Sequence, residues 1–560
     1  MTRTTPMARW GCILLLVVGL YACGKKSTEP GTTKVAPVAV ADSFTVLATS
    51  DLKDAQPLEQ MVEQATGVKL RFRFGGTMES TEAVQTGQAH ADAAWFANAK
   101  YLLSDPQGQA RVKLQEKIML SPVVVGVSES QAKELGWDQP DAASKVTWND
   151  IAKAAKAGKL RYALSNPATS NQGFMALMGV VASAAQKSEA LTVADVDRAA
   201  IAGFIRGYKL VGDNSSYLSE KFIEQQNTRV NAYINYESWL LSLNQSGKLK
   251  EKLTLIYPHE GVATADYPLM LLDDAKREQY QKVVAYLKGE AAQTWLAKTT
   301  LRRPVNNAVA QAQAGLFPQG SMLIELPFST DRALADGLIN AYLNEFRTPI
   351  ASTFVLDVSG SMNFNGRRQQ LVESLQYIAG DDASLTGRIA RLTNRERLWM
   401  LPFSEQVYAS TYFQMPGLQR DAANSKGLAP LADSQEKQKV LAQVRDYADS
   451  LQMSGGTALY DAVLQALVNM NAERLKNPGY QYSVVAFTDG ENNKGRGLAE
   501  FKAAYARLPE DVRAIPVFMV LFGEASEADL KELVATTGGR TFDARKASLY
   551  SVFKDIRAYQ

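Results

Sequence analysis

Five oxygen-bearing side chains in the last two-fifths of the chain have the types and the spacing of ligands for a hard divalent cation. They are Asp357, Ser359, Ser361, Thr457 and Asp489. The first three alternate along one short segment, so their side chains can converge, and Gly360 between the serines permits a tight turn. Mg²⁺ prefers oxygen ligands and usually keeps some water. The pattern predicts a divalent-cation site, with Mg²⁺ as the first expectation and Mn²⁺ or Ca²⁺ as alternatives.

The predicted site carries too little negative charge for a dication. It offers two carboxylates, from Asp357 and Asp489, and three neutral hydroxyls. A cation held in this way attracts a further negative oxygen, which the Asp or Glu of a second protein can supply. The set therefore predicts cation-dependent protein binding. Asp-x-Ser-x-Ser alone is also common as a simple turn after a strand, so Thr457 and Asp489 carry much of the argument.

The segments around these residues alternate between apolar strands and amphipathic helices. Strands are expected at 353–356, 482–487 and 517–522, and the last is apolar throughout, as when helices cover both faces of a sheet. A helix with its apolar residues on one side follows Thr457. The order predicts a doubly wound α/β domain. The polar residues fall at the carboxyl ends of strands, where such sheets bind ligands.

With all five positions present in order, residues 348–560 resemble a von Willebrand factor type A (VWA) domain with a complete metal-ion-dependent adhesion site. The resemblance implies a doubly wound, Rossmann-like fold and a role in adhesion. It also implies that the two serines and the threonine lie nearest the metal, while the two aspartates often act through water. A domain that keeps the motif but binds no metal is the alternative.

Residues 43–340 show another strand–turn–helix alternation, which favours an open α/β sheet. Ser50 and Thr77 fall where a strand gives way to a helix, so they are either ligands for an oxygen-rich molecule or simple helix N-caps. The order of segments resembles bacterial extracellular solute-binding proteins, which have two lobes. By that resemblance five residues would face the cleft between the lobes: Ser50, Thr77, Ser121, Ser170 and Tyr236.

The solute itself is not specified by these segments. Hydroxyls and helix N-termini suit an oxyanion, and they suit a sugar or a peptide end equally well. The apolar segment 121–127 is expected to cross between the lobes. Trp95 is expected in the core, with a place in the wall of the cleft as the alternative.

The first residues have the composition of a targeting segment. Residues 1–22 contain a basic leader and an apolar stretch that is too short to span a membrane. The sequence around Cys23 resembles a bacterial lipoprotein signal, with cleavage before Cys23 and lipid on its thiol; an ordinary secretory signal is the alternative. Gly24 favours the outer membrane if the organism has one. Residues 23–42 are then the lipidated cysteine and a flexible tether.

Composition excludes several classes of function. Lys and Arg (61) nearly cancel Asp and Glu (58), and a net charge of +3 gives no sign of nucleic-acid binding. The chain has 2 Cys, both in the first 23 residues, and 2 His, so a thiolate zinc site or a Ser-His-Asp triad is not expected. The sequence contains no Gly-rich phosphate-binding loop with its Lys, no His-Glu-x-x-His and no Gly-x-Ser-x-Gly motif. Two short basic runs, 302–304 and 494–496, are expected on the solvated surface.

Together these features favour a binding protein over an enzyme. The first hypothesis is a lipid-anchored protein of the cell envelope, facing the periplasm or the exterior, whose cation site grips a protein partner and whose N-terminal module senses a solute. The alternative is the solute receptor of an ABC-type transporter, with residues 348–560 as a docking platform.

Overall fold

The computed structural model describes residues 43–560 except 188–190, 213–214, 319–322, 327–328, 330, 419–426, 429–431, 491, 523–526, 545–551, 554–555 and 558–560. The predicted leader, Cys23 and the tether lie outside the described residues. No helix in the described part of the chain combines the length and the apolar character needed to cross a membrane.

The first sheet has five strands in the order β2-β1-β3-β11-β4. The central pairs β1–β2 and β1–β3 are parallel, and β11 runs antiparallel to β3 and β4. The helices α1 (Leu58–Thr66) and α2 (Thr77–Thr86) make the crossovers that parallel strands require. The strands are β1 (Ser43–Thr49), β2 (Lys69–Gly75), β3 (Ala93–Trp95), β4 (Leu114–Lys117) and β11 (Pro268–Leu271).

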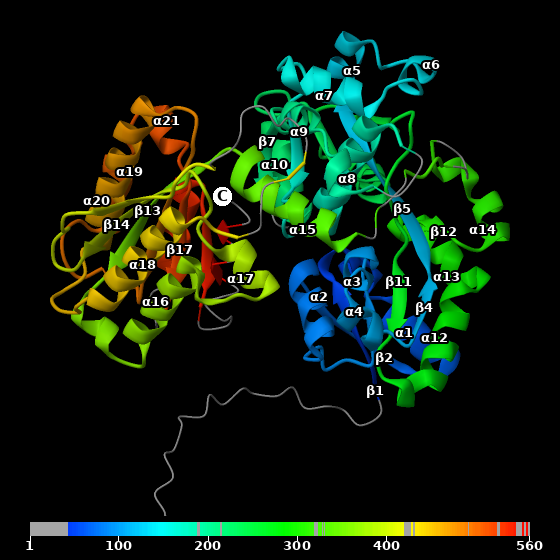
Figure 1. The fold of residues 1–560 in the computed structure, drawn as a ribbon, viewed down its shortest axis with the longest axis horizontal. Coiled ribbons are helices and arrows are strands. Elements are labelled where there is room, and N and C mark those ends of the chain that lie inside the picture. The colour runs from blue at the N-terminus through cyan, green and yellow to red at the C-terminus, as the bar shows by residue number, and fades with distance from the viewer. Residues whose placement is uncertain are drawn as a thin grey trace, which may run out of the picture. The chain divides into compact units, whose positions relative to one another are not determined.

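The second sheet has seven strands. Five follow the order β10-β5-β8-β6-β7, and β9 and β12 pair with β5 as well. The strands are β5 (Met119–Ser128), β6 (Tyr162–Ser165), β7 (Tyr208–Gly212), β8 (Ala232–Tyr236), β9 (Leu253–Ile256), β10 (Thr264–Ala265) and β12 (Arg303–Pro304). Helices α7 (Trp148–Lys156), α8 (Asn171–Ala185) and α11 (Glu237–Gln245) belong to this lobe. The two sheets are the two lobes that the sequence predicted (Figure 1).

The chain passes between the two lobes at three places: between β4 and β5, between β10 and β11, and just before β12. The prediction that 121–127 forms a crossing is wrong, because all of β5 pairs within the second sheet and the crossing falls just before it. Two non-glycine residues at the other crossings have left-handed backbone, Tyr267 (φ 40°) and Leu301 (φ 54°). Such conformations are costly for side chains and persist only where the surroundings hold them.

The third sheet starts at Ile350 and has six strands in the order β15-β14-β13-β16-β17-β18. All neighbours are parallel except β14 and β15. This is the doubly wound sheet that the sequence predicted. The strands are β13 (Ile350–Asp357), β14 (Arg397–Phe403), β15 (Thr411–Gln414), β16 (Gln481–Thr488), β17 (Val517–Leu521) and β18 (Arg540–Asp543).

Helices cover both faces of the third sheet (Figure 1). On β13, Phe354 and Leu356 pack in the cluster that contains α16 (Arg367–Gln376) and α18 (Gln435–Ser450). The alternate residues Ala351 and Val355 pack with α19 (Leu459–Lys476) and α20 (Leu498–Ala506). Because successive strand side chains point to opposite faces, a strand covered on both sides is buried along its whole length, as β13 is.

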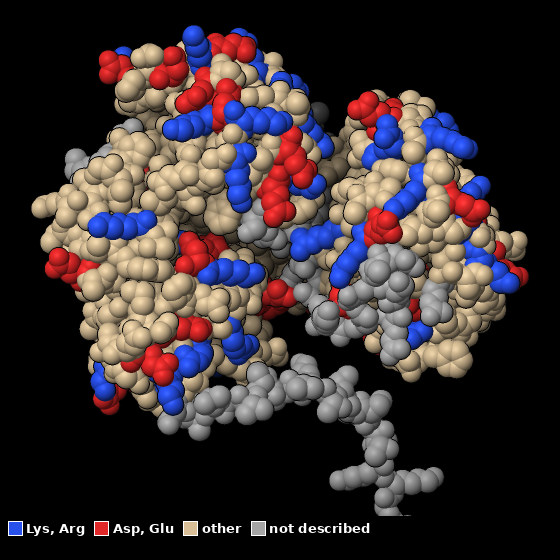
Figure 2. All heavy atoms as spheres, turned by 180° about the vertical axis from the view of Figure 1, so that it is seen from behind, with Lys and Arg blue, Asp and Glu red and all other residues tan. Residues whose placement is uncertain are grey.

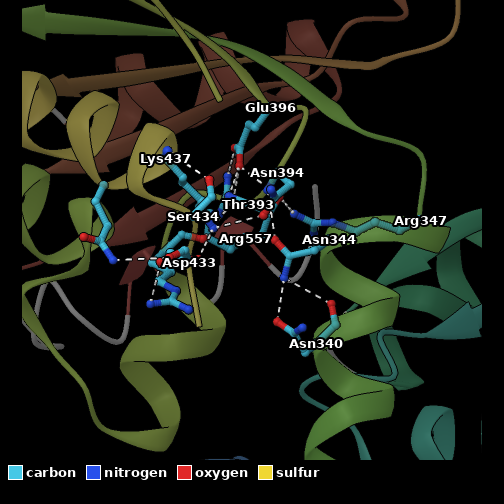
Figure 3. A network of polar contacts seen from close by, with 12 residues as sticks. Asn340, Asn344, Arg347, Thr393, Asn394, Glu396, Asp433, Ser434, Lys437 and Arg557 are labelled. Atoms are coloured by element: carbon cyan, nitrogen blue, oxygen red, sulfur yellow. Dashed lines mark hydrogen bonds and ion pairs between the residues drawn. The ribbon is translucent and has the colours of Figure 1, made fainter. Parts of the chain in front are cut away.

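A buried polar cluster joins the segment before β13 to the third sheet (Figure 3). We call Asn344, Arg347, Thr393, Glu396 and Arg557 the junction network. Asn344, in the helical turn η6 (Tyr342–Phe346), accepts a hydrogen bond from the backbone N–H of residue 394 (2.9 Å). Arg347 donates to Thr393 Oγ1 (2.9 Å), and Thr393 donates its N–H to Glu396 (2.7 Å). Arg557, near the C-terminus, donates both terminal nitrogens to the Glu396 carboxylate.

Acidic and basic side chains alternate over the face in Figure 2, without a broad area of one sign. Lys494 and Arg496 are exposed, as predicted. The same prediction for Arg302 and Arg303 is wrong, because they are only 2% and 4% exposed. Arg302 pairs with Asp54, 248 residues earlier in the chain. Arg303 pairs with Glu237, which is fully buried, so the charges of these two residues compensate each other inside the protein.

Candidate functional site

The five predicted cation ligands lie at one edge of the third sheet. Asp357 ends β13, Asp489 directly follows the neighbouring parallel strand β16, and Thr457 lies just before α19. Ser359 precedes the short helix η7 (Gly360–Asn363), which contains Ser361. Carboxyl ends of parallel strands meet at one edge of a sheet, so the topology brings loops together that are over a hundred residues apart in sequence.

Asp357 is fully buried, and neutral donors hold its carboxylate in place. Its Oδ1 accepts the N–H of Ser359 (2.9 Å), and its Oδ2 accepts the hydroxyl of Thr488 (2.7 Å). Burial raises the pKa of Asp357 to about 6, with a smaller contribution from the like charge of Asp489. Burial therefore disfavours the charged form of this carboxyl group, and a cation beside it would favour that form.

The two serine hydroxyls converge. Ser359 Oγ and Ser361 Oγ are 3.0 Å apart. Adjacent ligands of an octahedral Mg²⁺ at roughly 2.0–2.1 Å from the metal lie about 2.9 Å from each other. The spacing of the two hydroxyls therefore fits neighbouring positions on one small cation.

Backbone hydrogen bonds fix the loop of Thr457 against the loop of the serines. The N–H of Gly360 donates to the carbonyl of Gly455 (3.0 Å), and Ser454 N–H donates to the carbonyl of Val358 (2.7 Å). Thr457 is 2% exposed, and its own N–H donates to Asn493 Oδ1 (2.9 Å). The structure thus brings Thr457 to the same edge as the serines. The role of Asn493 was not predicted, because nothing in the local sequence distinguishes it from its neighbour Asn492.

Asp489 is the one predicted ligand with a cationic partner. Arg367 Nη1 donates to Asp489 Oδ2 (2.6 Å), and the two side chains are 16% and 4% exposed. The role of Arg367 was not predicted, although this residue follows Ser361 by only six positions. Among the described residues, no three His, Cys, Asp or Glu side chains gather as a metal site. The candidate centre has only two carboxylates, so it depends on hydroxyl oxygens.

The five residues predicted to bind a solute have different surroundings. Ser50 is exposed at the start of a 3₁₀ turn, and Thr77 is half-buried at the first position of α2. Neither is the N-cap residue, since those positions belong to Thr49 and Gly76. Ser170 is the N-cap of α8 and accepts a hydrogen bond from the N–H of residue 173.

Ser121 and Tyr236 lie close together in the second sheet, because Val123 is the partner of Tyr236. Ser121 is fully buried, and it donates to Ser238 Oγ and accepts the N–H of that residue, both at 3.1 Å. Tyr236 is 4% exposed and packs against the ring of Tyr267, 6.1 Å between centroids. No hydrogen bond among the described residues links the five predicted side chains to one another.

A buried polar cluster that the sequence did not reveal lies at the crossings between the lobes. Arg302 pairs with Asp54 (2.6 Å), donates to the carbonyl of Asp51 (2.6 Å) and lies 5.0 Å from the ring centroid of Tyr267. Burial raises the pKa of Asp51, against the opposing charge of Arg302. The side chains of Thr49 and Tyr267 also act on Asp51 and lower its pKa, so the carboxyl group is not isolated in the cluster. The cluster offers a polar solute buried hydrogen-bonding groups.

Trp95 is fully buried and donates its indole N–H to the carbonyl of Tyr267 (2.9 Å). The expectation that it belongs to the core is confirmed. Its hydrogen bond also ties the first lobe to the crossing segment, which holds Tyr267 in place beside the polar cluster.

Two families match parts of this chain. The bacterial extracellular solute-binding proteins match residues 44–302, and the von Willebrand factor type A domain matches residues 412–556. The chain thus contains a solute-binding module and a VWA domain. A comparison with curated proteins found no match.

Several solved structures are similar to part of the chain. The periplasmic binding protein AfuA of Actinobacillus pleuropneumoniae, with fructose-6-phosphate bound, is 13% identical, with 54% of this chain and 98% of that one covered and a TM-score of 0.42. Trichodesmium IdiA (FutA), in complex with iron and citrate, is 14% identical, with 54% of this chain and 98% of that one covered and a TM-score of 0.41. The sulfate-binding protein SubI of Mycobacterium tuberculosis is 18% identical, with 50% of this chain and 92% of that one covered and a TM-score of 0.38. All three TM-scores are below 0.5.

Proposed function

We propose that this chain, which joins a bacterial extracellular solute-binding module to a von Willebrand factor type A domain, captures a protein partner through a divalent cation. Asp357, Ser359, Ser361, Thr457 and Asp489 would hold the cation, with Mg²⁺ as the first expectation. The bound ion would supply an electrophilic position for one carboxylate oxygen of an Asp or Glu on the partner. Binding, rather than catalysis, is the activity.

The observation that carries the proposal is the convergence of Ser359 Oγ and Ser361 Oγ, 3.0 Å apart, beside the buried carboxylate of Asp357. Burying an unpaired carboxylate is costly, and a cation would compensate it. The negative charge of the five residues is still too small for a dication. The partner carboxylate makes up part of that deficit, which ties partner capture to cation binding.

The surface next to the centre suits a protein partner. Phe364 is 66% exposed, and its N–H donates to the carbonyl of Ser361 (3.2 Å), so the ring stands beside the cation loop. Tyr408 is 37% exposed, and its hydroxyl contacts Ser404 Oγ (2.7 Å). Exposed aromatic side chains commonly anchor protein interfaces. They support a protein rather than a small ion alone as the final ligand.

Calorimetric titration of the purified chain with Mg²⁺ and then Mn²⁺ tests the proposal. We expect saturable binding of one ion, lost in Asp357→Asn and weakened at least tenfold in Thr457→Ala. Thr411→Ala on the exposed edge strand is the matched control and keeps the wild-type affinity. An absence of binding at millimolar concentrations of both ions would overturn the proposal.

We propose an envelope location as well, with lipid on Cys23 and the folded modules facing the periplasm or the exterior. The membership of residues 44–302 in an extracellular family supports this placement. The resemblance of the leader to a lipoprotein signal supports the anchor.

A second candidate function is solute reception for an ABC-type transporter, with the VWA domain as a docking platform. The buried polar cluster of Asp51, Tyr267 and Arg302 at the crossings between the two lobes favours it. Sulfate, glucose and a dipeptide represent the three solute classes that the sequence left open. We expect one of them to raise the melting temperature, and Tyr267→Phe to reduce the rise while the exposed Tyr412→Phe leaves it intact. If none of the three raises it, this candidate is excluded for those classes.

A further inference from the structure

Arg367 contacts two of the five residues of the candidate cation centre. It is the first residue of α16, and its Nη1 donates to Asp489 Oδ2 (2.6 Å) and to the carbonyl of Ser361 (3.3 Å). The Arg367 side chain is 16% exposed and that of Asp489 is 4% exposed. An ion pair this well shielded from solvent is stronger than one at the surface.

Arg367 lies at the end of its helix where a positive charge is unfavourable, so its ion pair with Asp489 also compensates this charge. The N-terminus of a helix carries a partial positive charge, which disfavours a basic residue in the first turn. The first turn of α16 contains no acidic residue to offset this. The Asp489 carboxylate therefore supplies the compensation that the helix itself does not provide.

The ion pair changes the charge that a cation would meet. Of the two carboxylates in the centre, Asp489 is already paired with a guanidinium, and Asp357 accepts hydrogen bonds from neutral donors. The three charged groups together carry one net negative charge instead of two. A guanidinium beside the centre also repels a dication directly.

We propose that Arg367 is a built-in competitor of the divalent cation: the guanidinium and the cation bind Asp489 in turn. Cation affinity is then set by how readily Arg367 leaves the carboxylate. The side chain is long and starts at a helix end near the surface, so it can swing into solvent when the cation arrives. This inference rests on the proposed function, since it concerns the same centre.

The neighbouring Arg368 provides a matched control. It lies in the same helical turn and has the same charge, but it donates to the carbonyls of Leu451 and Asp449 (both 3.1 Å) and not to the centre. Replacing either arginine with glutamine removes one positive charge near α16. Only Arg367→Gln frees Asp489.

The experiment is calorimetric titration of the full chain with Mn²⁺ for the wild type, Arg367→Gln, Arg367→Lys and Arg368→Gln. We expect Arg367→Gln to bind Mn²⁺ at least tenfold more tightly than the wild type, and Arg368→Gln to differ from it by less than threefold. Arg367→Lys keeps the charge without the planar fork and should fall between the two.

Melting temperatures give a second measurement that does not depend on the titration. With chelator present, Arg367→Gln should melt below the wild type, because Asp489 has lost its partner. With saturating Mn²⁺ the order should reverse. A guanidinium that stays paired while the metal binds would leave the variant below the wild type in both conditions.

The possible results separate the two proposals. Unchanged or weaker Mn²⁺ binding by Arg367→Gln overturns the competitor role and leaves the proposed function standing. Binding by both proteins, with that of Arg367→Gln at least tenfold tighter, supports the competitor role and the proposed function together. If no variant binds Mn²⁺, the proposed function fails and the competitor role fails with it.

Discussion

Replacing Glu396 with glutamine tests whether the junction network stabilises the third sheet. Glu396 and Arg557 are each 2% exposed at their side chains, and the pair is also bonded to Thr393. Burial alone would raise the pKa of Glu396, but the charge and hydrogen bonds of Arg557 outweigh it and hold the pKa below the usual 4.5. Glutamine keeps the shape and removes the charge. The buried guanidinium of Arg557 then loses the carboxylate of Glu396.

The expected cost follows from the burial of the pair. Removing one partner of a buried ion pair typically destabilises a protein by about 3–5 kcal/mol. Arg347 increases the cost. It is only 6% exposed in the same network, and burial lowers its pKa to about 10, while the negative charge of Glu396 acts to raise it. Taking about 3 kcal/mol, the amides of β13 and β16 that exchange only on unfolding should exchange roughly a hundredfold faster. Hydrogen exchange followed by mass spectrometry measures this for the third sheet within the full chain.

Two comparisons make the result decisive. Glu373→Gln, on the exposed side of α16, should change the exchange free energy by less than about 0.5 kcal/mol. The stability should also depend on pH in a known direction. A carboxylate whose pKa is lower in the folded protein than in the unfolded chain adds stability above its unfolded pKa. For Glu396 this contribution disappears as the pH falls below 4.5. The difference between wild type and Glu396→Gln should therefore shrink in acid. A cost below about 1 kcal/mol at pH 7 would refute the reasoning.

Two further predictions concern other parts of the chain. Because burial raises the pKa of Asp357 to about 6, protons should compete with the cation, and Mn²⁺ affinity should fall about tenfold from pH 7 to pH 5; an affinity that is constant over this range would show that no group titrating near pH 6 competes with protons for the cation. Cys23→Ser should abolish incorporation of labelled fatty acid and release the chain from the membrane fraction, whereas Cys12→Ser, inside the predicted leader, should leave both unchanged; continued labelling of Cys23→Ser would exclude the anchor.

Much of the fold could be predicted from local patterns. Apolar runs such as 517–522, interrupted by helices with one apolar side, indicated a doubly wound sheet, and β13 and β16 pair as that prediction requires. The five cation-ligand candidates could be found because Asp-x-Ser-x-Ser is a short-range pattern. The later Thr457 and Asp489 each fall at the end of a strand or the start of a helix, where topology concentrates ligands.

The partners of those residues could not be predicted. Arg367 pairs with a residue 122 positions away, and Arg302 pairs with one 248 positions away. Arg302 was expected at the surface and Arg367 was not singled out at all, because a sequence shows a charge but not the depth at which it is buried. Thr488 and Asn493 likewise gain their roles only from the loops that they meet.

The sequence by itself determined which atoms are available at the edge of the third sheet, since alternation along a strand and its loop is a local property of the backbone. Only the tertiary structure decided how those atoms are charged and held. A hydrogen bond or an ion pair depends on distances of a few ångströms between segments that the chain brings together through register and packing, and no local pattern encodes those distances. The proposed cation site is thus a sequence property, and its control by Arg367 is a property of the fold.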